Sequence, residues 1–183
     1  MQLKVAMTAV VLAFLTGCDY TVSLVKKPEL PIDQALVGAW SQSDGNDKTE
    51  RLLVLPLGPN EYLVSFPAGE KTAMFARACL CHAANRTLAQ LTWFGTAQGV
   101  LPEDNRVFQY AAYSVKGDTL YVNLLNADVV KRDAASAEAL IQAISANTNN
   151  PDLFRETMTF KKEKPPADVN APVTRPPVPA AWR

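Results

Sequence analysis

The sequence predicts a mainly β fold in one domain, with antiparallel strands and one late α-helix. Apolar residues make up 48% of the 183 residues, which is enough for one packed core. Short segments in which apolar and polar residues alternate follow one another, and glycine, proline, asparagine and aspartate separate them. One later segment has the period of an amphipathic helix instead.

Eight segments have the alternation of a β-strand with one buried face. The third segment is typical, because Tyr62, Val64 and Phe66 fall on one face and the residues between them fall on the other. Such alternation predicts a sheet with one dry face. The eight segments are residues 36–41, 51–55, 61–66, 71–81, 87–94, 107–115, 119–126 and 157–161.

The turns indicate that strands adjacent in the sequence pair with each other. Gly117-Asp118, between the sixth and seventh segments, suits a two-residue type II′ hairpin, because glycine readily takes the positive φ of the first central position. Residues 57–60 and 68–70 are also rich in turn formers. We therefore expect the second, third and fourth segments to form a meander.

The single helix is predicted over residues 136–147. Apolar residues from Ala137 to Ile144 recur at i, i+3, i+4 and i+7, so they form one stripe that must cover apolar surface. Asp133 or Ser136 can cap the N-terminus. Asparagines followed by Pro151 end the pattern.

Residues 1–17 have the parts of a secretory signal peptide. Lys4 supplies positive charge, an apolar run of about 11 residues follows, and small residues precede Cys18. A helix of that length is too short for the hydrocarbon core of a bilayer, so we do not expect it to be a permanent transmembrane helix.

Leu15-Thr16-Gly17-Cys18 resembles the lipobox of bacterial lipoproteins. The resemblance implies that the signal peptide is cut before Cys18 and that Cys18 carries fatty acyl chains such as palmitate. The mature protein would then be anchored in the cell envelope and face the periplasm. Asp19 resembles the signal that retains lipoproteins of enteric bacteria in the inner membrane. An outer-membrane position and an ordinary cysteine at position 18 are the alternatives.

Residues 18–35 are predicted to be a linker between the lipid and the domain. They contain Pro28 and Pro31 and show no sustained apolar period. The β domain is expected over residues 36–163.

Residues 164–183 are rich in proline and cannot form a core, which predicts a projecting, disordered tail. Trp182 and Arg183 lie at its tip and are residue types that often anchor interfaces, so they are candidates for docking a partner. A solvated end without function is the alternative.

Charge and composition exclude several functions. Lysine and arginine total 18 and aspartate and glutamate total 18, so no excess of positive charge favours nucleic acid. No acid pair, serine–histidine set or phosphate-binding glycine loop stands out. We therefore expect no enzymatic activity and no cofactor.

Cys79-Leu80-Cys81-His82 is the one cluster of soft metal ligands in the sequence. Its spacing matches neither the zinc nor the thioredoxin-like nor the haem pattern. Cys79 and Cys81 share one face of a strand, so they are candidates for a disulfide or for two small buried residues, and no metal site is expected.

Gly38-Ala39-Trp40, at the start of the first strand, resembles the G-x-W element of lipocalins and related barrels. The resemblance implies an antiparallel eight-stranded barrel, or a strongly curved meander, in which the tryptophan closes one end and an apolar ligand enters at the other. Most aromatic residues in the strands are expected to fill the core. The candidates for ligand contact or barrel lining are Trp40, Tyr62, Phe66, Trp93, Tyr110 and Tyr113.

Two functions are compatible with these observations. The first is a lipid-anchored, non-enzymatic module that binds another envelope component. The second is a lipocalin-like carrier or sensor of a small apolar ligand. An eight-stranded barrel is only just wide enough for side chains or one small ligand, so the choice depends on whether its interior is hollow.

Overall fold

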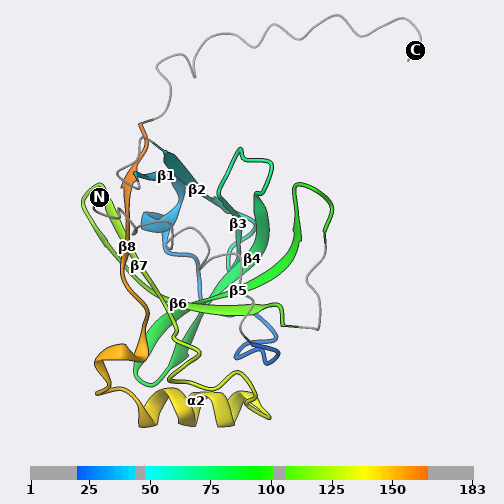
Figure 1. The fold of residues 1–183 in the computed structure, drawn as a ribbon, viewed down its shortest axis with the longest axis vertical. Helices are drawn as coiled ribbons and strands as arrows, with labels where there is room; N and C mark the ends of the chain where they lie inside the picture. Colours follow the sequence, from blue (N-terminus) through cyan, green and yellow to red (C-terminus); the bar gives the residue numbers. More distant parts are fainter. Residues whose placement is uncertain (1–19, 44–47, 101–105, 165–183) are drawn as a thin grey trace, which may run out of the picture.

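The computed structural model describes residues 20–43, 48–100 and 106–164. Within these residues, eight antiparallel strands form a closed barrel in sequence order, and the last strand pairs with the first (Figure 1). The prediction of a mainly β fold with eight antiparallel strands and one late α-helix is confirmed, and the barrel is the form that occurs.

The strands lie close to the predicted segments. They are β1 (Gly38–Ser43), β2 (Thr49–Pro56), β3 (Tyr62–Phe66), β4 (Met74–Ala83), β5 (Arg86–Thr96), β6 (Phe108–Lys116), β7 (Thr119–Leu124) and β8 (Met158–Lys162). The helices are the short 3-10 helices η1 (Gln34–Leu36) and η2 (Pro151–Leu153), and the α-helix α2 (Ala137–Ala146).

One hydrophobic core lies inside the barrel. It contains Trp40 of β1, the alternating residues Tyr62, Val64 and Phe66 of β3, and Phe160 of β8. The period-two pattern of the sequence therefore identified which side chains of these strands point inward.

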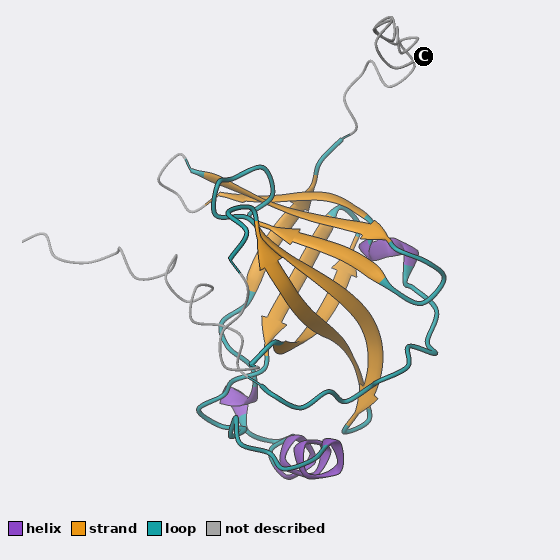
Figure 2. Cartoon of the chain, turned by 90° about the vertical axis from the view of Figure 1, so that its right-hand side faces the viewer, coloured by secondary structure: helices purple, strands orange, loops and turns teal. Residues whose placement is uncertain are grey.

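A second core lies outside the barrel, against the outer face of β4, β5 and β6. Tyr110 of β6 and Leu88 of β5 belong to this core together with Leu140 and Ile144 of α2. Figure 2 shows α2 below the strands, outside the barrel. The apolar stripe of the helix thus covers the outer sheet face and leaves the interior of the barrel free.

The helix begins and ends as its sequence predicts. Ser136 is the N-cap, and its hydroxyl accepts a hydrogen bond from the backbone N–H of Ala139 (3.2 Å). Of the two predicted caps, Ser136 is therefore the one that is used. Asn147 ends the helix, and its amide donates to the carbonyl of Ala143 (2.8 Å).

Two hairpin turns contrast with each other. Gly117 has a φ of 57°, which agrees with the predicted Gly-Asp turn between β6 and β7. Ala84 and Asn85 join β4 to β5 and both have positive φ, which is uncommon for alanine. This turn lacks the usual Asn-Gly signal, and the two long strands that it joins extend beyond their predicted ends.

Residues 20–28, which we call the N-terminal arm, were predicted to belong to a linker but pack against the barrel. Tyr20 is completely buried, and its backbone exchanges hydrogen bonds with Phe108 at the start of β6 (3.0 and 3.1 Å). The Tyr20 hydroxyl donates to the carbonyl of Val130 (3.0 Å), and its ring packs edge-on against Tyr110 at 5.4 Å between centroids. The arm therefore has a fixed position.

Side chains from parts of the chain that are distant in the sequence form hydrogen bonds with backbone N–H and carbonyl groups of the arm. The Gln90 side-chain oxygen accepts hydrogen bonds from the backbone N–H groups of Leu24 (2.8 Å) and Val25 (3.0 Å). The Gln90 amide nitrogen donates to the carbonyl of Val25 (2.9 Å). The Asn60 amide holds the carbonyl of Pro28 (3.0 Å) near the turn between β2 and β3. An extended, proline-containing segment is thus ordered without regular structure.

Candidate functional site

The candidate site is a cavity of about 90 Å³ inside the barrel. All eight strands surround the interior, but residues of β2 to β8 and of η1 line the cavity itself. The lining residues are Leu36, Leu52, Val54, Tyr62, Val64, Phe66, Ala78, Ala89, Leu91, Trp93, Gln109, Ala111, Tyr113, Leu120, Val122, Leu124, Met158 and Phe160.

The cavity exists because small alanine side chains line it on three neighbouring strands. Ala78 of β4, Ala89 of β5 and Ala111 of β6 all point inward, and Ala89 and Ala111 lie opposite each other in the strand pairing. An eight-stranded barrel lined only by large residues would be filled. The lining residues predicted from the sequence were all aromatic and did not include these alanines, although their place on the inward face follows from the period-two pattern.

Four of the six predicted lining residues contact the cavity: Tyr62, Phe66, Trp93 and Tyr113. Trp40 is buried in the same core but does not line the cavity. Tyr110 lies outside the barrel, in the core beneath the N-terminal arm, so its prediction as a lining residue is wrong. Tyr110 and Tyr113 are three residues apart on one strand, and residues at that spacing face opposite sides of a sheet.

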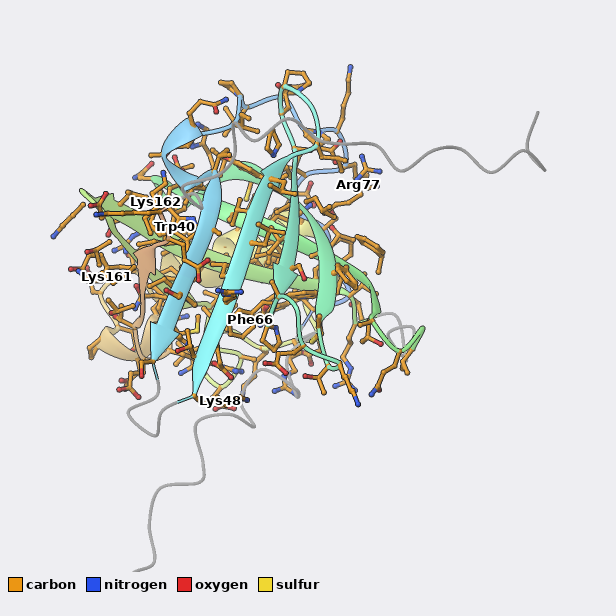
Figure 3. All side chains as sticks on the ribbon, turned by 90° about the horizontal axis from the view of Figure 1, so that it is seen from above. Trp40, Lys48, Phe66, Arg77, Lys161 and Lys162 are labelled. Atoms are coloured by element: carbon orange, nitrogen blue, oxygen red, sulfur yellow. The ribbon has the colours of Figure 1, made fainter. Side chains whose placement is uncertain are left out.

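The helix η1 and Trp40 cover one end of the barrel. The indole N–H of Trp40 donates to the carbonyl of Leu36 (2.9 Å), which itself lines the cavity. Figure 3 shows Lys162 beside Trp40 at the seam between β1 and β8, and the Lys162 ammonium lies 5.0 Å from the centre of the indole ring.

Gly38 in the G-x-W element is required by this packing. Its φ is +145°, and a Cβ atom at this position would lie 3.2 Å from Cε of Lys162. A side chain there would strain the backbone and crowd Lys162, whose ammonium lies over the Trp40 ring. The Gly-Ala-Trp pattern therefore has a structural reason in this chain.

Polar groups at the covered end are paired among themselves. The Tyr113 hydroxyl donates to one carboxylate oxygen of Asp33 (3.4 Å), and the other oxygen accepts from the backbone N–H of Ala35 (2.9 Å). Burial, and then the nearby charge of Asp33, raise the pKa of Tyr113 to about 12. Burial also raises the pKa of Tyr62. Both phenols are therefore neutral at pH 7.

The polar side chains on the inward faces are also bonded. Gln109 is buried, and its side-chain oxygen accepts from the indole N–H of Trp93 (3.2 Å). Toward the end of the barrel opposite η1, the carboxylate of Glu50 accepts from the amide of Gln42 (3.0 Å) and lies 3.6 Å from the ammonium of Lys48. The cavity wall between these two ends is formed almost entirely by apolar side chains.

Comparisons with protein-family models, curated proteins and solved structures return no match. The resemblance of Gly38-Ala39-Trp40 to the lipocalin element therefore stays a prediction from the sequence, and the structure shows a closed eight-stranded barrel.

Cys79 and Cys81 are free, buried thiols, and the candidate disulfide is not formed. Both lie on the outer face of β4, whereas Leu80 between them belongs to the interior core. Alternate residues of an extended strand are about 6.5 Å apart, close to the upper limit for a disulfide. Burial raises the pKa of Cys79 to about 11 and that of Cys81 to about 12, so both stay protonated near neutral pH.

His82 lies apart from these thiols, with Nδ1 3.2 Å from the hydroxyl of Thr87. In the described part of the chain, no group of three or more histidine, cysteine, aspartate or glutamate side chains is placed to hold a metal ion.

Four predicted site residues, Cys18, Asp19, Trp182 and Arg183, lie outside the described residues. Over the residues that are described, no helix combines the length and apolar character needed to cross a bilayer.

Proposed function

We propose that this protein is a lipid-anchored, non-enzymatic binding protein of the bacterial cell envelope that holds a small apolar ligand inside its barrel. The observation that carries the proposal is the apolar cavity of about 90 Å³. Of the two functions predicted from the sequence, this cavity favours the carrier or sensor over the interaction module.

The size and chemistry of the cavity favour a slender hydrocarbon. One water molecule needs ~10–15 Å³ in a cavity with polar partners, so the interior has room for several heavy atoms. The Trp93 indole is bonded to Gln109, and the Tyr113 hydroxyl is bonded to Asp33. Since these groups are already paired, the wall offers little to a polar ligand. An unbranched acyl chain is the ligand class that fits best.

The sequence supports the anchor. Cys18 follows lipobox-like residues and a signal peptide, and two or three acyl chains hold a protein stably on a membrane, where a single chain is marginal. Asp19 favours the inner membrane with the barrel facing the periplasm. Docking of an envelope protein through Trp182 and Arg183 stays a prediction of the sequence.

The ligand can be tested by titrating the protein, prepared without residues 1–18 to avoid detergent, with unbranched fatty acids brominated at the methyl end. Trp93 lines the cavity, so a bound bromine should quench its fluorescence in a saturable way. Replacing Trp93 by phenylalanine should remove most of the quenching.

Ala111→Leu supplies the decisive variant, because Ala111 is buried on the cavity wall. It should weaken fatty acid binding at least about tenfold, which corresponds to about 1.4 kcal/mol. Ala112→Leu is the matched control, since Ala112 packs against the outer core. Equal binding by the Ala111 variant, or no saturable quenching with any chain length, would refute the proposed function.

A further inference from the structure

The N-terminal arm determines where a lipid on Cys18 can be. Tyr20 is held at the start of β6 by its backbone pairing with Phe108, and from the loop before α2 by the bond from its hydroxyl to Val130. It is fully buried, so this end of the arm cannot swing away from the barrel without exposing an aromatic core residue.

Covalent geometry then limits the distance between lipid and barrel. An extended chain spans at most ~3.6 Å per residue, so Cα of Cys18 lies within ~7 Å of Cα of Tyr20 in any conformation. A lipid at Cys18 is therefore attached beside the start of β6, without a long tether. The surface near Tyr20 must meet the bilayer.

That surface carries exposed apolar side chains. On the outer face, Phe108 pairs with Thr92 of β5, and Phe94 lies one pleat further along the same strand. Phe94 is the extra residue of a β-bulge opposite Phe75 and Ala76. Regular spacings of ~4.8 Å between strands and ~3.3 Å per residue would put its Cα about 12 Å from Cα of Tyr20. Phe94 is 47% exposed and stacks on Phe75 with ring centroids 6.5 Å apart.

Val100, in the turn that follows β5, is 54% exposed. It is held near the strand end by hydrogen bonds of its backbone N–H and carbonyl with Thr96. Four large apolar side chains are exposed among the described residues: Leu55, Leu57, Phe94 and Val100. Two of them, Phe94 and Val100, lie on β5 and in the turn that follows it.

Charge contributes little to this surface. Lys131 and Arg132 follow Val130 and are exposed, but Asp128 and Asp133 are exposed on the same segment. Exposed Lys26, Lys27 and Glu29 follow Tyr20 in the chain, and exposed Glu138 interacts electrostatically with Lys26. The basic and acidic side chains of these segments are therefore equal in number. Attraction to the membrane has to come from the apolar side chains, and it should not depend on anionic lipid.

We propose that the outer face of β5 and the start of β6, around Phe94 and Val100, rests on the bilayer that holds the lipid of Cys18. This orientation depends on the lipid anchor of the proposed function but does not depend on the ligand. It places the end of the barrel opposite η1 at the membrane, because β5 ends and β6 begins there. The turn between β2 and β3 then points into the periplasm.

The test compares two cysteine variants of the full-length, lipidated protein in phosphatidylcholine vesicles. Val100→Cys and Leu57→Cys each receive an environment-sensitive fluorophore. Leu57 is a matched control, because it is a similarly exposed apolar residue at the other end of the barrel. Cys79 and Cys81 are buried and protonated at pH 7, so they should escape labelling.

The fluorescence emission of the label at position 100 should shift to shorter wavelength, and spin-labelled acyl chains should quench it. Aqueous iodide should quench only the label at position 57. Adding phosphatidylglycerol should leave both signals unchanged. If the lipidated protein shows equal iodide quenching at both positions, the orientation is wrong and the anchor stands. A mass spectrum showing an unmodified Cys18 would overturn the anchor together with the orientation.

Discussion

The hydroxyl of Tyr62 on β3 bonds both backbone groups of Asp33: it accepts from the N–H (2.5 Å) and donates to the carbonyl (3.3 Å). Asp33 is also the N-cap of η1, so one phenol of the barrel wall fixes the helix that covers the cavity. A lining residue of the site therefore also determines how the end of the barrel is closed.

Tyr62→Phe removes both hydrogen bonds and keeps the ring. Each bond contributes about 0.5–1.5 kcal/mol, so the free energy of unfolding should fall by about 1–3 kcal/mol in a urea titration. Tyr121→Phe, on the outer face of β7, is the control and should change it by less than about 0.5 kcal/mol. Equal stability of both variants would show that η1 is held by other contacts.

Trp40→Ala should lower the free energy of unfolding by about 3–5 kcal/mol, because it removes a fully buried aromatic side chain and leaves a cavity beneath η1. Trp40→Phe keeps part of the volume and should cost less. Thermal and urea unfolding measure both variants. A melting temperature of Trp40→Ala equal to that of the wild type would contradict the packing of Trp40 in the core.

The buried thiols predict a loss of stability in alkali. Burial holds the pKa of Cys79 at about 11 and that of Cys81 at about 12, whereas both ionise near 9.0 once the chain unfolds. The unfolded state then loses protons first, so stability is complete below about pH 9 and declines as the pH rises through the folded pKa values. Each thiol contributes about 1.4 kcal/mol per pH unit in that interval.

Replacing Cys79 and Cys81 by alanine should flatten this decline between about pH 9 and pH 10.5. The tyrosines are the same in both proteins, so the difference between the two slopes belongs to the thiols. Urea unfolding at a series of pH values gives the slopes. Identical slopes would mean that the thiols are accessible to solvent in the folded protein.

Cys18→Ser should abolish the attachment of lipid, because Cys18 alone follows the lipobox-like residues. The variant should appear as an uncleaved or soluble precursor and should incorporate no labelled fatty acid. Replacing Cys79 by serine is the matched control and should leave labelling intact. Labelled lipid in the Cys18 variant would show that the anchor is elsewhere.

Local patterns predicted much of this fold. Alternation located all eight strands, Gly117 predicted its hairpin, and Ser136 was one of two predicted caps. The Ala84-Asn85 turn was not predictable, because alanine with positive φ opposes its own local preference and is imposed by the pairing of β4 with β5.

The N-terminal arm was not predictable for a different reason. Its order depends on Gln90 and on Tyr110, whose hydroxyl donates to the carbonyl of Val22. These partners are more than 60 residues away in the sequence, and prolines with mixed polar residues are also typical of a true linker. The hollow interior likewise depends on which strands are neighbours, since only the barrel brings Ala89 and Ala111 together.

The short strand β8 has a consequence for how the chain folds. Its residues Met158–Lys162 pair with both β7 and β1. In the sequence, β7 is the strand that precedes β8, whereas β1 lies at the other end of the domain. Until this strand arrives, β1 and β7 expose unpaired backbone edges, which are templates for association between molecules. Pairing of the first strand with the last also closes a loop of more than 100 residues, a slow and late step. The folding chain therefore needs protection from aggregation until its last strand has closed the barrel.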